Sequence, residues 1–321
     1  MNETLLTVKV AKKTMEAEAI ASFELVDANN APLPPFTAGS HIDVHLPAGL
    51  IRQYSLCNDA GETSRYRIAV LRDVNSRGGS VAMHDQVHEG SEIRISAPKN
   101  HFALEPTAAR SLLLAGGIGV TPILAMARTL SQQGADFDMK YCSRSRARAA
   151  FHDEIRASGF AGRVGFYFDE GEGARRLDIG TALDQAGSAA HLYVCGPQGF
   201  IDVVVMAAKE RGWTDKRIHY EYFGAAPVRS EDDGSFEVRL ASSGKVYTVA
   251  KDKTVVQALA AHGVEIPVSC EQGVCGTCIT KVCGGVPDHR DMYLTDAEHE
   301  ANDQFTPCCS RSKTPLLVLD L

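Results

Sequence analysis

The sequence has neither a long uninterrupted apolar run nor an excess of positive charge. Its most apolar stretch, Leu112 to Ala127, is broken by three glycines and Pro122, and the first twenty residues hold no apolar core of the signal-peptide kind. We therefore expect a cytoplasmic protein without a membrane span. The 33 Lys and Arg against 40 Asp and Glu give a net charge of -7. This charge argues against nucleic-acid binding, because neutralising phosphates requires clustered basic side chains.

Histidine spacing also fails to predict a metal site. The histidines considered as ligands lack metal-ligand spacing, and we interpret them as solvated or packed side chains: His41, His84, His88, His101 and His289. The composition is otherwise typical of a globular protein, with 44% hydrophobic and 23% charged residues. A chain of 321 residues is long enough for about two or three domains.

Cysteine, in contrast, is abundant and unevenly distributed. Three of the nine cysteines are solitary, at 57, 142 and 195, whereas six lie between positions 270 and 309. Cys270, Cys275 and Cys278 follow the pattern C-x4-C-x2-C, and Cys308 lies 30 residues beyond Cys278. In a reducing compartment this spacing predicts a plant-type [2Fe-2S] cluster rather than disulfides. The loop needs small residues because its backbone N–H groups must turn inward to the sulfides.

Zinc is the main alternative for these thiols. Structural zinc usually takes ligands in pairs two to four residues apart, and Cys308 has only the adjacent Cys309. The spacing does not decide whether Cys308 or Cys309 is the last ligand. We interpret Cys283, which fits neither pattern, as a small packed thiol near the cluster.

The residues around the cysteines predict a ferredoxin-like β-grasp domain over 236–321, an α+β fold. Residues 236–250 alternate as a hairpin, and 254–264 form a helix capped by Thr254 and ended by Gly263. Residues 315–321 supply a closing strand. The preceding segment, "GAAPVRSEDDGS", is rich in small, acidic and turn residues, so we expect a linker over 226–235.

Residues 104–225 alternate apolar strands with helical stretches. The strand candidates are "SLLLAG", "FDMKYCS", "RVGFYFD", "HLYVCG" and "RIHYEYF". Five strands with intervening helices predict an α/β domain with a doubly wound parallel sheet.

Two turns in this domain are suited to a dinucleotide. After the first strand, Gly116, Gly117 and Gly119 let the backbone approach a pyrophosphate, and Pro122 starts a helix whose N-terminus faces it. The fourth strand ends in "CGP", residues 195–197, at the same carboxyl edge, where ligands bind. The glycine fingerprint is incomplete, because Pro122 stands at its last glycine position, and a tight strand-to-helix turn is the alternative.

The choice between NADH and NADPH is not settled by these residues. An acidic residue that binds the adenosine ribose is expected about 20 residues beyond the glycines. The sequence offers only Ser143, Arg144, Ser145 and Arg146 there.

The first 103 residues read as short strands broken by Pro, Gly and Asn, which predicts a small antiparallel β-barrel. "RQYS", with Arg52, Tyr54 and Ser55, combines a cation, an aromatic face and a hydroxyl suited to a flat anionic cofactor. "RGGS", residues Arg77, Gly78, Gly79 and Ser80, precedes a helix-like segment and could hold a phosphate through exposed N–H groups. A surface turn is the alternative.

Four motifs in this order resemble those of the phthalate dioxygenase reductase and vanillate demethylase reductase family. They are R-x-Y-S, G-G-I-G-x-T-P, C-G-P, and C-x4-C-x2-C with a distant Cys. The resemblance covers essentially all 321 residues. It implies FMN in the barrel, with Arg52 and Ser80 toward the phosphate, Tyr54 against the ring and Ser55 near its N5. It also implies that Phe223 covers the other ring face and that Cys195 lies beside the nicotinamide.

In the nucleotide domain the resemblance extends to Thr121 and Pro122 after the glycines and to Gly196 and Pro197 after Cys195. In the last domain it favours Cys308 as the fourth ligand, because family members place that ligand three residues before an arginine, here Arg311. It favours NADH over NADPH, although contact of Ser143 and Arg144 with a 2'-phosphate would reverse that preference.

The implied function is an electron-transfer reductase with the path NADH to FMN to [2Fe-2S] to a Rieske-type terminal oxygenase, reached near Glu271 and Gln272. No residue need act as a nucleophile or general acid, and we expect a monomer. Two alternatives are a general flavin reductase that feeds a ferredoxin or cytochrome, and a non-catalytic binding protein. The aromatic substrate of the partner cannot be read, because a reductase of this kind never touches it.

Overall fold

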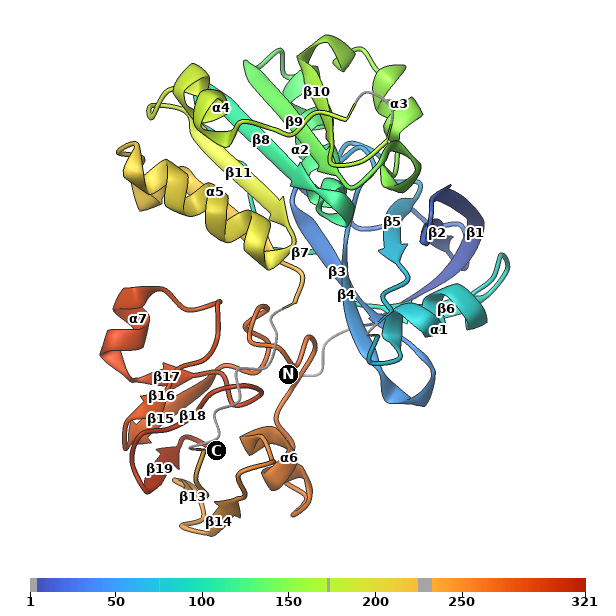
Figure 1. Ribbon diagram of the computed structural model, residues 1–321. Coiled ribbons are helices and arrows are strands. Elements are labelled where there is room, and N and C mark those ends of the chain that lie inside the picture. The colour runs from blue at the N-terminus through green and yellow to red at the C-terminus, as the bar shows by residue number, and fades with distance from the viewer. Residues whose placement is uncertain (1–4, 75, 172–173, 225–232) are drawn as a thin grey trace. The chain divides into compact units, whose positions relative to one another are not determined.

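The computed structural model describes residues 5–74, 76–171, 174–224 and 233–321 (Figure 1). The chain divides into two compact units, Met1–Phe223 and Gly224–Leu321. The predicted linker lies outside the described residues up to position 232. The domain boundaries expected after residues 103, 225 and 235 stay predictions. No helix within the described ranges is long and apolar enough to cross a bilayer.

The first unit begins with an antiparallel sheet. Its strands are β1 (Leu6–Ala17), β2 (Ile20–Asp27), β3 (Ser40–His45), β4 (Ile51–Ser55), β5 (Tyr66–Leu71), β6 (Glu92–Ile95) and β7 (Lys99–Asn100). The order is β4-β3-β6-β1-β2-β5, with β7 on β3, and a bridge between Leu56 and Ile68 joins its two edges. Side chains alternate between core and solvent, as in β1, where Val8 and Val10 are buried and Lys9 is exposed. The antiparallel barrel prediction is confirmed.

Two short helices belong to this barrel. They are the 3-10 turn η1 (Pro47–Gly49) and the helix α1 (Gly79–Gln86). Gly78 precedes α1 with φ 90°, a left-handed conformation that a side chain would strain. The predicted glycine pair therefore forms the sharp entry to α1.

The second sheet of this unit is parallel. Its strands are β8 (Ser111–Gly116), β9 (Phe137–Ser143), β10 (Val164–Phe168), β11 (His191–Gly196) and β12 (Ile218–Tyr222). They lie in the order β10-β9-β8-β11-β12, so β8 has β9 on one side and β11 on the other. This reversal of strand order is a topological switch point, where α/β sheets bind ligands at the carboxyl ends of the strands.

Helices cover both faces of this sheet. They are α2 (Val120–Gln132), α3 (His152–Arg156), α4 (Ile179–Ala186) and α5 (Gln198–Glu210), with 3-10 turns η2 (Gly117–Gly119), η3 (Arg146–Arg148), η4 (Ala161–Arg163) and η5 (Asp215–Arg217). Leu113 and Ala115 of β8 pack with α2 and α3, whereas Leu112 and Leu114 pack with α4 and α5. Burial on both faces explains the continuous apolar run of β8, and the doubly wound prediction is confirmed.

The second unit contains a mixed sheet. Its elements are β13 (Phe236–Leu240), β14 (Val246–Val249), α6 (Val255–Ala260), β15 (Thr280–Gly284), β16 (Pro287–Asp288), α7 (Asp296–Ala301), β17 (Gln304–Phe305), β18 (Arg311–Ser312) and β19 (Leu316–Leu319). The order is β14-β13-β19-β15-β17, with β13 and β19 parallel, and β16 pairs with β18. Val255 and Leu259 of α6 pack on Leu317 and Leu319, which gives the predicted β-grasp core.

Local signals explain both helices of this unit. Thr254 and Gln257 form a capping box at the start of α6, as Thr254 predicts, but the helix ends at Ala260, before Gly263. Thr295 and Glu298 form a second capping box at α7, a helix the sequence analysis missed. The interpretation of Cys283 as a packed thiol is wrong. Side chains alternate along β15, so Val282 is buried and the side chain of Cys283 is exposed.

Candidate functional site

The two turns predicted to bind a dinucleotide touch each other. A Cβ atom on Gly119 would lie 2.3 Å from the carbonyl oxygen of Cys195 and 2.6 Å from the nitrogen of Gly196. A Cβ on Gly196 would lie 2.9 Å from the Cα of Gly116. The backbones after β8 and β11 can approach this closely only because glycine has no side chain. The contact lies at the switch point of the parallel sheet.

The neighbouring residues complete this turn. Gly117 has φ 53°, in the left-handed region, and Thr121 Oγ1 donates to the carbonyl of Ile118 at 3.1 Å. Pro122 stands in the first turn of α2, where its missing N–H costs no hydrogen bond. Pro197 directly precedes α5. Two helix N-termini thus start beside the glycine contact, an arrangement able to bind a pyrophosphate.

Ser143 and Arg144 follow β9 at the same sheet edge. Ser143 is buried at the end of the strand, and its carbonyl accepts from the N–H of Asp169 at 3.3 Å. The side chain of Arg144 is exposed. The segment after β9 therefore carries accessible cations at Arg144 and Arg146, where an acidic residue would be expected.

A partly buried carboxyl group joins the barrel to the parallel sheet. Ser55 Oγ, at the end of β4, lies 3.5 Å from Glu221 Oε2 of β12, and Glu221 is the strand partner of Cys195. Burial raises the pKa of Glu221 to about 8, with Ser55 acting in the opposite direction, so the carboxyl group holds a proton at neutral pH. Burial, helped by Glu221, also raises the pKa of the Cys195 thiol.

Ser55 and Cys195 are brought together by Glu221, which the sequence analysis missed. The signal that could have found Glu221 is a carboxylate between the two tyrosines of the strand "RIHYEYF". Phe223 directly follows β12 and is 41% exposed, so its ring is open to a ligand.

The expected phosphate site lies where β4 meets α1. Arg52 donates to the carbonyls of Ile51 and Arg77, at 2.7 and 3.1 Å. A Cβ on Gly79 would lie 2.5 Å from Arg52 Cγ, so the arginine stem lies directly against the first turn of α1. This places a guanidinium beside free helix N–H groups, which suits a phosphate.

Two other predicted residues are also placed here. Burial raises the pKa of Tyr54, which keeps its phenol neutral. The hydroxyl of Ser80 is already engaged, because it accepts from the N–H of Asp73 at 3.2 Å and lies 2.9 Å from Ser76 Oγ. Ser80 therefore helps to shape the turn before α1, and a phosphate would share its hydroxyl with these partners.

The four predicted ligand cysteines are buried and their sulfur atoms converge. Cys275 and Cys308 contact the sulfur of Cys270 and lower its pKa. Cys308 also contacts Cys278, and its pKa is raised by these sulfur neighbours. Cys309 also contacts Cys308, but its own sulfur lies toward Thr306 Oγ1, at 3.3 Å. This geometry supports Cys308 over Cys309 as the fourth ligand.

The loop backbone fits a cluster. Glu271, Gly273 and Gly276 have φ values of 55°, 72° and 70°, which turn N–H groups toward the sulfur atoms. The N–H of Gln272 donates to Cys270 Sγ at 3.3 Å. A Cβ on Gly276 would lie 2.4 Å from the ring of Tyr293, so this position accepts only glycine. The donor set and the inward N–H groups are those of a plant-type [2Fe-2S] site.

Arg311 has a structural role in the same unit. Its guanidinium donates to the carbonyls of Lys253, Gly234 and Ala250 at 2.9, 2.9 and 3.4 Å. The arginine thereby fixes the segment that follows Cys308 to the β13–α6 region.

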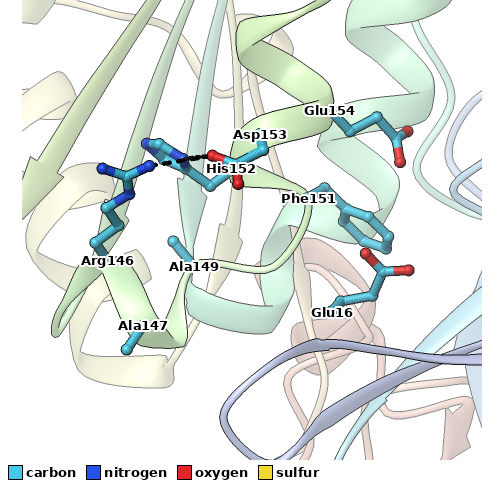
Figure 2. A pocket seen from close by; sticks show the side chains of 8 residues that line it. All are labelled: Glu16, Arg146, Ala147, Ala149, Phe151, His152, Asp153 and Glu154. Atoms are coloured by element: carbon cyan, nitrogen blue, oxygen red, sulfur yellow. Dashed lines mark hydrogen bonds and ion pairs between the residues drawn. The ribbon is translucent and has the colours of Figure 1, made fainter.

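A hollow of about 580 Å³ lies apart from the predicted residues (Figure 2). Figure 2 shows Glu16 and Glu154 near the ring of Phe151, with Arg146 at the other end. Arg67 binds Glu16 at 2.7 Å and Glu154 at 2.8 Å, and its guanidinium lies 4.6 Å from the centre of the Phe151 ring. The hollow thus borders an ion-pair network between the barrel and the segment after β9.

Comparison with known proteins agrees with this geometry. Residues 238–313 match the family of 2Fe-2S iron-sulfur cluster binding domains, and residues 91–218 match the N-terminal domain of dimethylamine monooxygenase subunit DmmA-like proteins. Vanillate O-demethylase oxidoreductase of Pseudomonas sp. (strain HR199 / DSM 7063) is 53% identical over 99% of this chain and 100% of its own length.

Two further matches are to phthalate dioxygenase reductase, one by sequence and one by structure. Phthalate dioxygenase reductase of Burkholderia cepacia is 40% identical over 98% of this chain and 97% of its own length. A solved structure of phthalate dioxygenase reductase, described as a modular structure for electron transfer from pyridine nucleotides to [2Fe-2S], superimposes with a TM-score of 0.78. It is 40% identical and covers 99% of this chain and 98% of its own.

Proposed function

The chain belongs to the oxygenase reductase family that includes vanillate O-demethylase oxidoreductase and phthalate dioxygenase reductase, and from this membership we propose its electron path. It is an oxidoreductase of electron transfer with a [2Fe-2S] domain. The path runs from NADH to FMN, then to the cluster, and then to the oxygenase component of a Rieske-type aromatic oxygenase. The domains are 1–103 for FMN, 104–225 for NAD(H) and 236–321 for the cluster.

One observation carries this proposal. Three residues from different strands meet at the carboxyl edge of the parallel sheet. They are Ser55 of the barrel strand β4, Glu221 of β12 and Cys195 of the neighbouring strand β11. A flavin held by the barrel and a nicotinamide held by the sheet would be adjacent there. FMN, when bound, accepts two electrons as hydride and releases them singly, as a one-electron cluster requires.

The residues of the chain position these groups. Arg52 and the first turn of α1 would bind the flavin phosphate, Tyr54 would pack on the ring, and Ser55 would lie near its N5. Phe223 would cover the other ring face when no nicotinamide is bound. Glu221 holds a proton beside Ser55, and the neutral Cys195 thiol would pack against the nicotinamide.

We also propose the oligomeric state of the protein, its compartment and the docking site of its partner. The chain acts as a monomer. It works in the cytoplasm, where the five cysteines outside the cluster would stay reduced. Its partner docks near Glu271 and Gln272 of the cluster loop.

The test is an absorption spectrum of the pure protein before and after anaerobic addition of NADH, with the released flavin identified and iron and zinc measured. We expect FMN, two irons per chain and loss of the flavin band. Zinc in place of iron, or a colourless protein, would contradict the proposal. Exchange of the electron acceptor then separates an oxygenase partner from a ferredoxin or cytochrome, because the true partner should react fast at low ionic strength.

A further inference from the structure

Three side chains of the second unit converge on one point beside the cluster loop. They are His289, which follows β16, Asp291, and His299 in the last turn of α7. One ligand atom from each lies within 4.8 Å of the other two. The two imidazole rings are stacked, with centres 4.4 Å apart and planes at 28°. One nitrogen of each ring lies within 4 Å of the Asp291 carboxylate.

The burial of these groups calls for an explanation. The side chain of Asp291 is fully buried and that of His289 is 7% exposed. Neither ring nitrogen of His289 makes a hydrogen bond of ordinary geometry among the described residues, although the Asn302 side chain lies beside the ring and interacts with it. Burying a polar group whose hydrogen bonds are weak is costly, and such groups often mark an ion or water site or a strained one.

The spacing of the donor atoms matches a small metal ion. His289 Nδ1 lies 3.8 Å from Asp291 Oδ1. His299 Nε2 lies 3.3 Å from Asp291 Oδ2, a hydrogen bond that a bound ion would replace. Ligands at zinc distances of about 2.1 Å and tetrahedral angles lie roughly 3.4 Å apart. Both nitrogen-to-oxygen distances are therefore close to the ligand separation that coordination requires. Small side-chain rotations would bring the donor atoms to that separation.

The surroundings of Asp291 are those of an oriented metal ligand. Its Oδ2 accepts from the N–H groups of Tyr293 and Leu294, at 3.2 and 2.8 Å, and its Oδ1 accepts from Ser310 Oγ at 3.4 Å. Ligating carboxylates are commonly held by such hydrogen bonds. The carboxylate cannot swing away from the two imidazoles without breaking them.

We propose that His289, Asp291 and His299 bind a divalent transition-metal ion of the zinc type, with water completing the coordination. Two imidazoles and one carboxylate form a donor set that suits this class. The ion would tie α7 to the segment that backs the cluster loop, where the N–H of Met292 donates to the carbonyl of Gly273 at 3.0 Å. Zinc carries no redox chemistry, so the site stabilises this unit and takes no part in electron transfer.

Histidine spacing in the sequence did not predict this site. The ligands follow H-x-D-x7-H, and only the turn after Asp291 and the start of α7 bring the last histidine back to the first two.

The test uses the full chain with its cofactors. The protein is treated with a mild chelator, incubated with Zn²⁺, passed through gel filtration and analysed for zinc and iron, while the visible spectrum reports the cluster. We expect about one zinc retained per chain beside an unchanged iron content. Added Zn²⁺ should also raise the melting temperature, because the folded state alone holds the assembled site.

The variant His289→Gln with His299→Gln should lower the zinc affinity at least about tenfold. The matched control is His191→Gln with His219→Gln, which removes a histidine pair of the first unit whose ring nitrogens lie 2.9 Å apart. The control should retain zinc. If the double variant loses its cluster, the single variant His299→Gln replaces it, because His299 is the most accessible of the three.

Three results would overturn the proposal: no zinc retained by the wild type, equal retention by the glutamine variant, or equal loss in the control. The first would mean that the three side chains form a hydrogen-bonded His-Asp-His group without a metal.

Discussion

Replacement of Gly119 by alanine should separate nucleotide binding from flavin binding. Gly119 has an ordinary helical φ of -61°, so alanine adds no backbone strain and acts only through its Cβ. That atom would lie 2.3 Å from the Cys195 oxygen and 2.4 Å from its carbonyl carbon, and both are backbone atoms that no rotamer change can move.

The expected magnitude follows from this geometry. To restore ordinary contact near 3.4 Å, the two turns must separate by about 1 Å, and misplacement of that size can lower a rate about 100-fold. This corresponds to about 2.7 kcal/mol in transition-state free energy. The overpacking itself should cost roughly 1–3 kcal/mol of stability.

Stopped-flow reduction of the bound flavin by NADH measures the effect as kcat/KM, and the flavin absorbance of the purified variant reports that the barrel is intact. Gly162→Ala is the matched control, because Gly162 has open space around its Cα, and it should reduce at the wild-type rate. Wild-type kinetics in Gly119→Ala would refute the argument that contact of the two turns positions the nucleotide.

Three further predictions concern other parts of the chain. Cys308→Ser should abolish the visible absorption of the cluster and leave flavin reduction by NADH intact, whereas Cys309→Ser should leave both; the reverse pattern would show that the ligand assignment is wrong. Arg144→Ala should reduce turnover with NADPH by about tenfold or less, the worth of one exposed charge contact, and leave turnover with NADH unchanged; an equal loss with both would place Arg144 outside the 2'-phosphate site. Burial lowers the pKa of His191 and of His219 below 6.5, so the folded state binds fewer protons than the unfolded state and stability should fall as pH drops below that value. The melting temperature should therefore fall less between pH 7.5 and about 5.5 in His219→Gln than in the wild type, and an equal fall would exclude this pair as the cause.

Much of the fold was predictable because its signals are local. The five strands of the parallel sheet were found within one residue of their ends, since buried parallel strands read as continuous apolar runs. The capping threonine of α6 was found for a similar reason, because a cap acts over three residues. The second capping box, at Thr295, carries the same signal and was overlooked.

The exposure of the Cys283 side chain could also have been predicted from the sequence. Val282 and Cys283 occupy alternate positions of one strand, and only one of them can face the core. The proximity of six cysteines in the sequence misled the interpretation, because a thiol near a cluster in sequence need not face it.

The sequence by itself determined the chemistry of each local motif: thiols at the spacing of a diiron loop, glycines where backbones must approach, and apolar runs that form strands. Only the tertiary structure decided which distant motifs meet. Glu221 lies beside Ser55, across 166 positions of chain, and His299 returns to His289 through a turn and a helix. Spacing is informative only while the chain between two residues has one regular conformation, and long-range contacts depend instead on how whole elements pack.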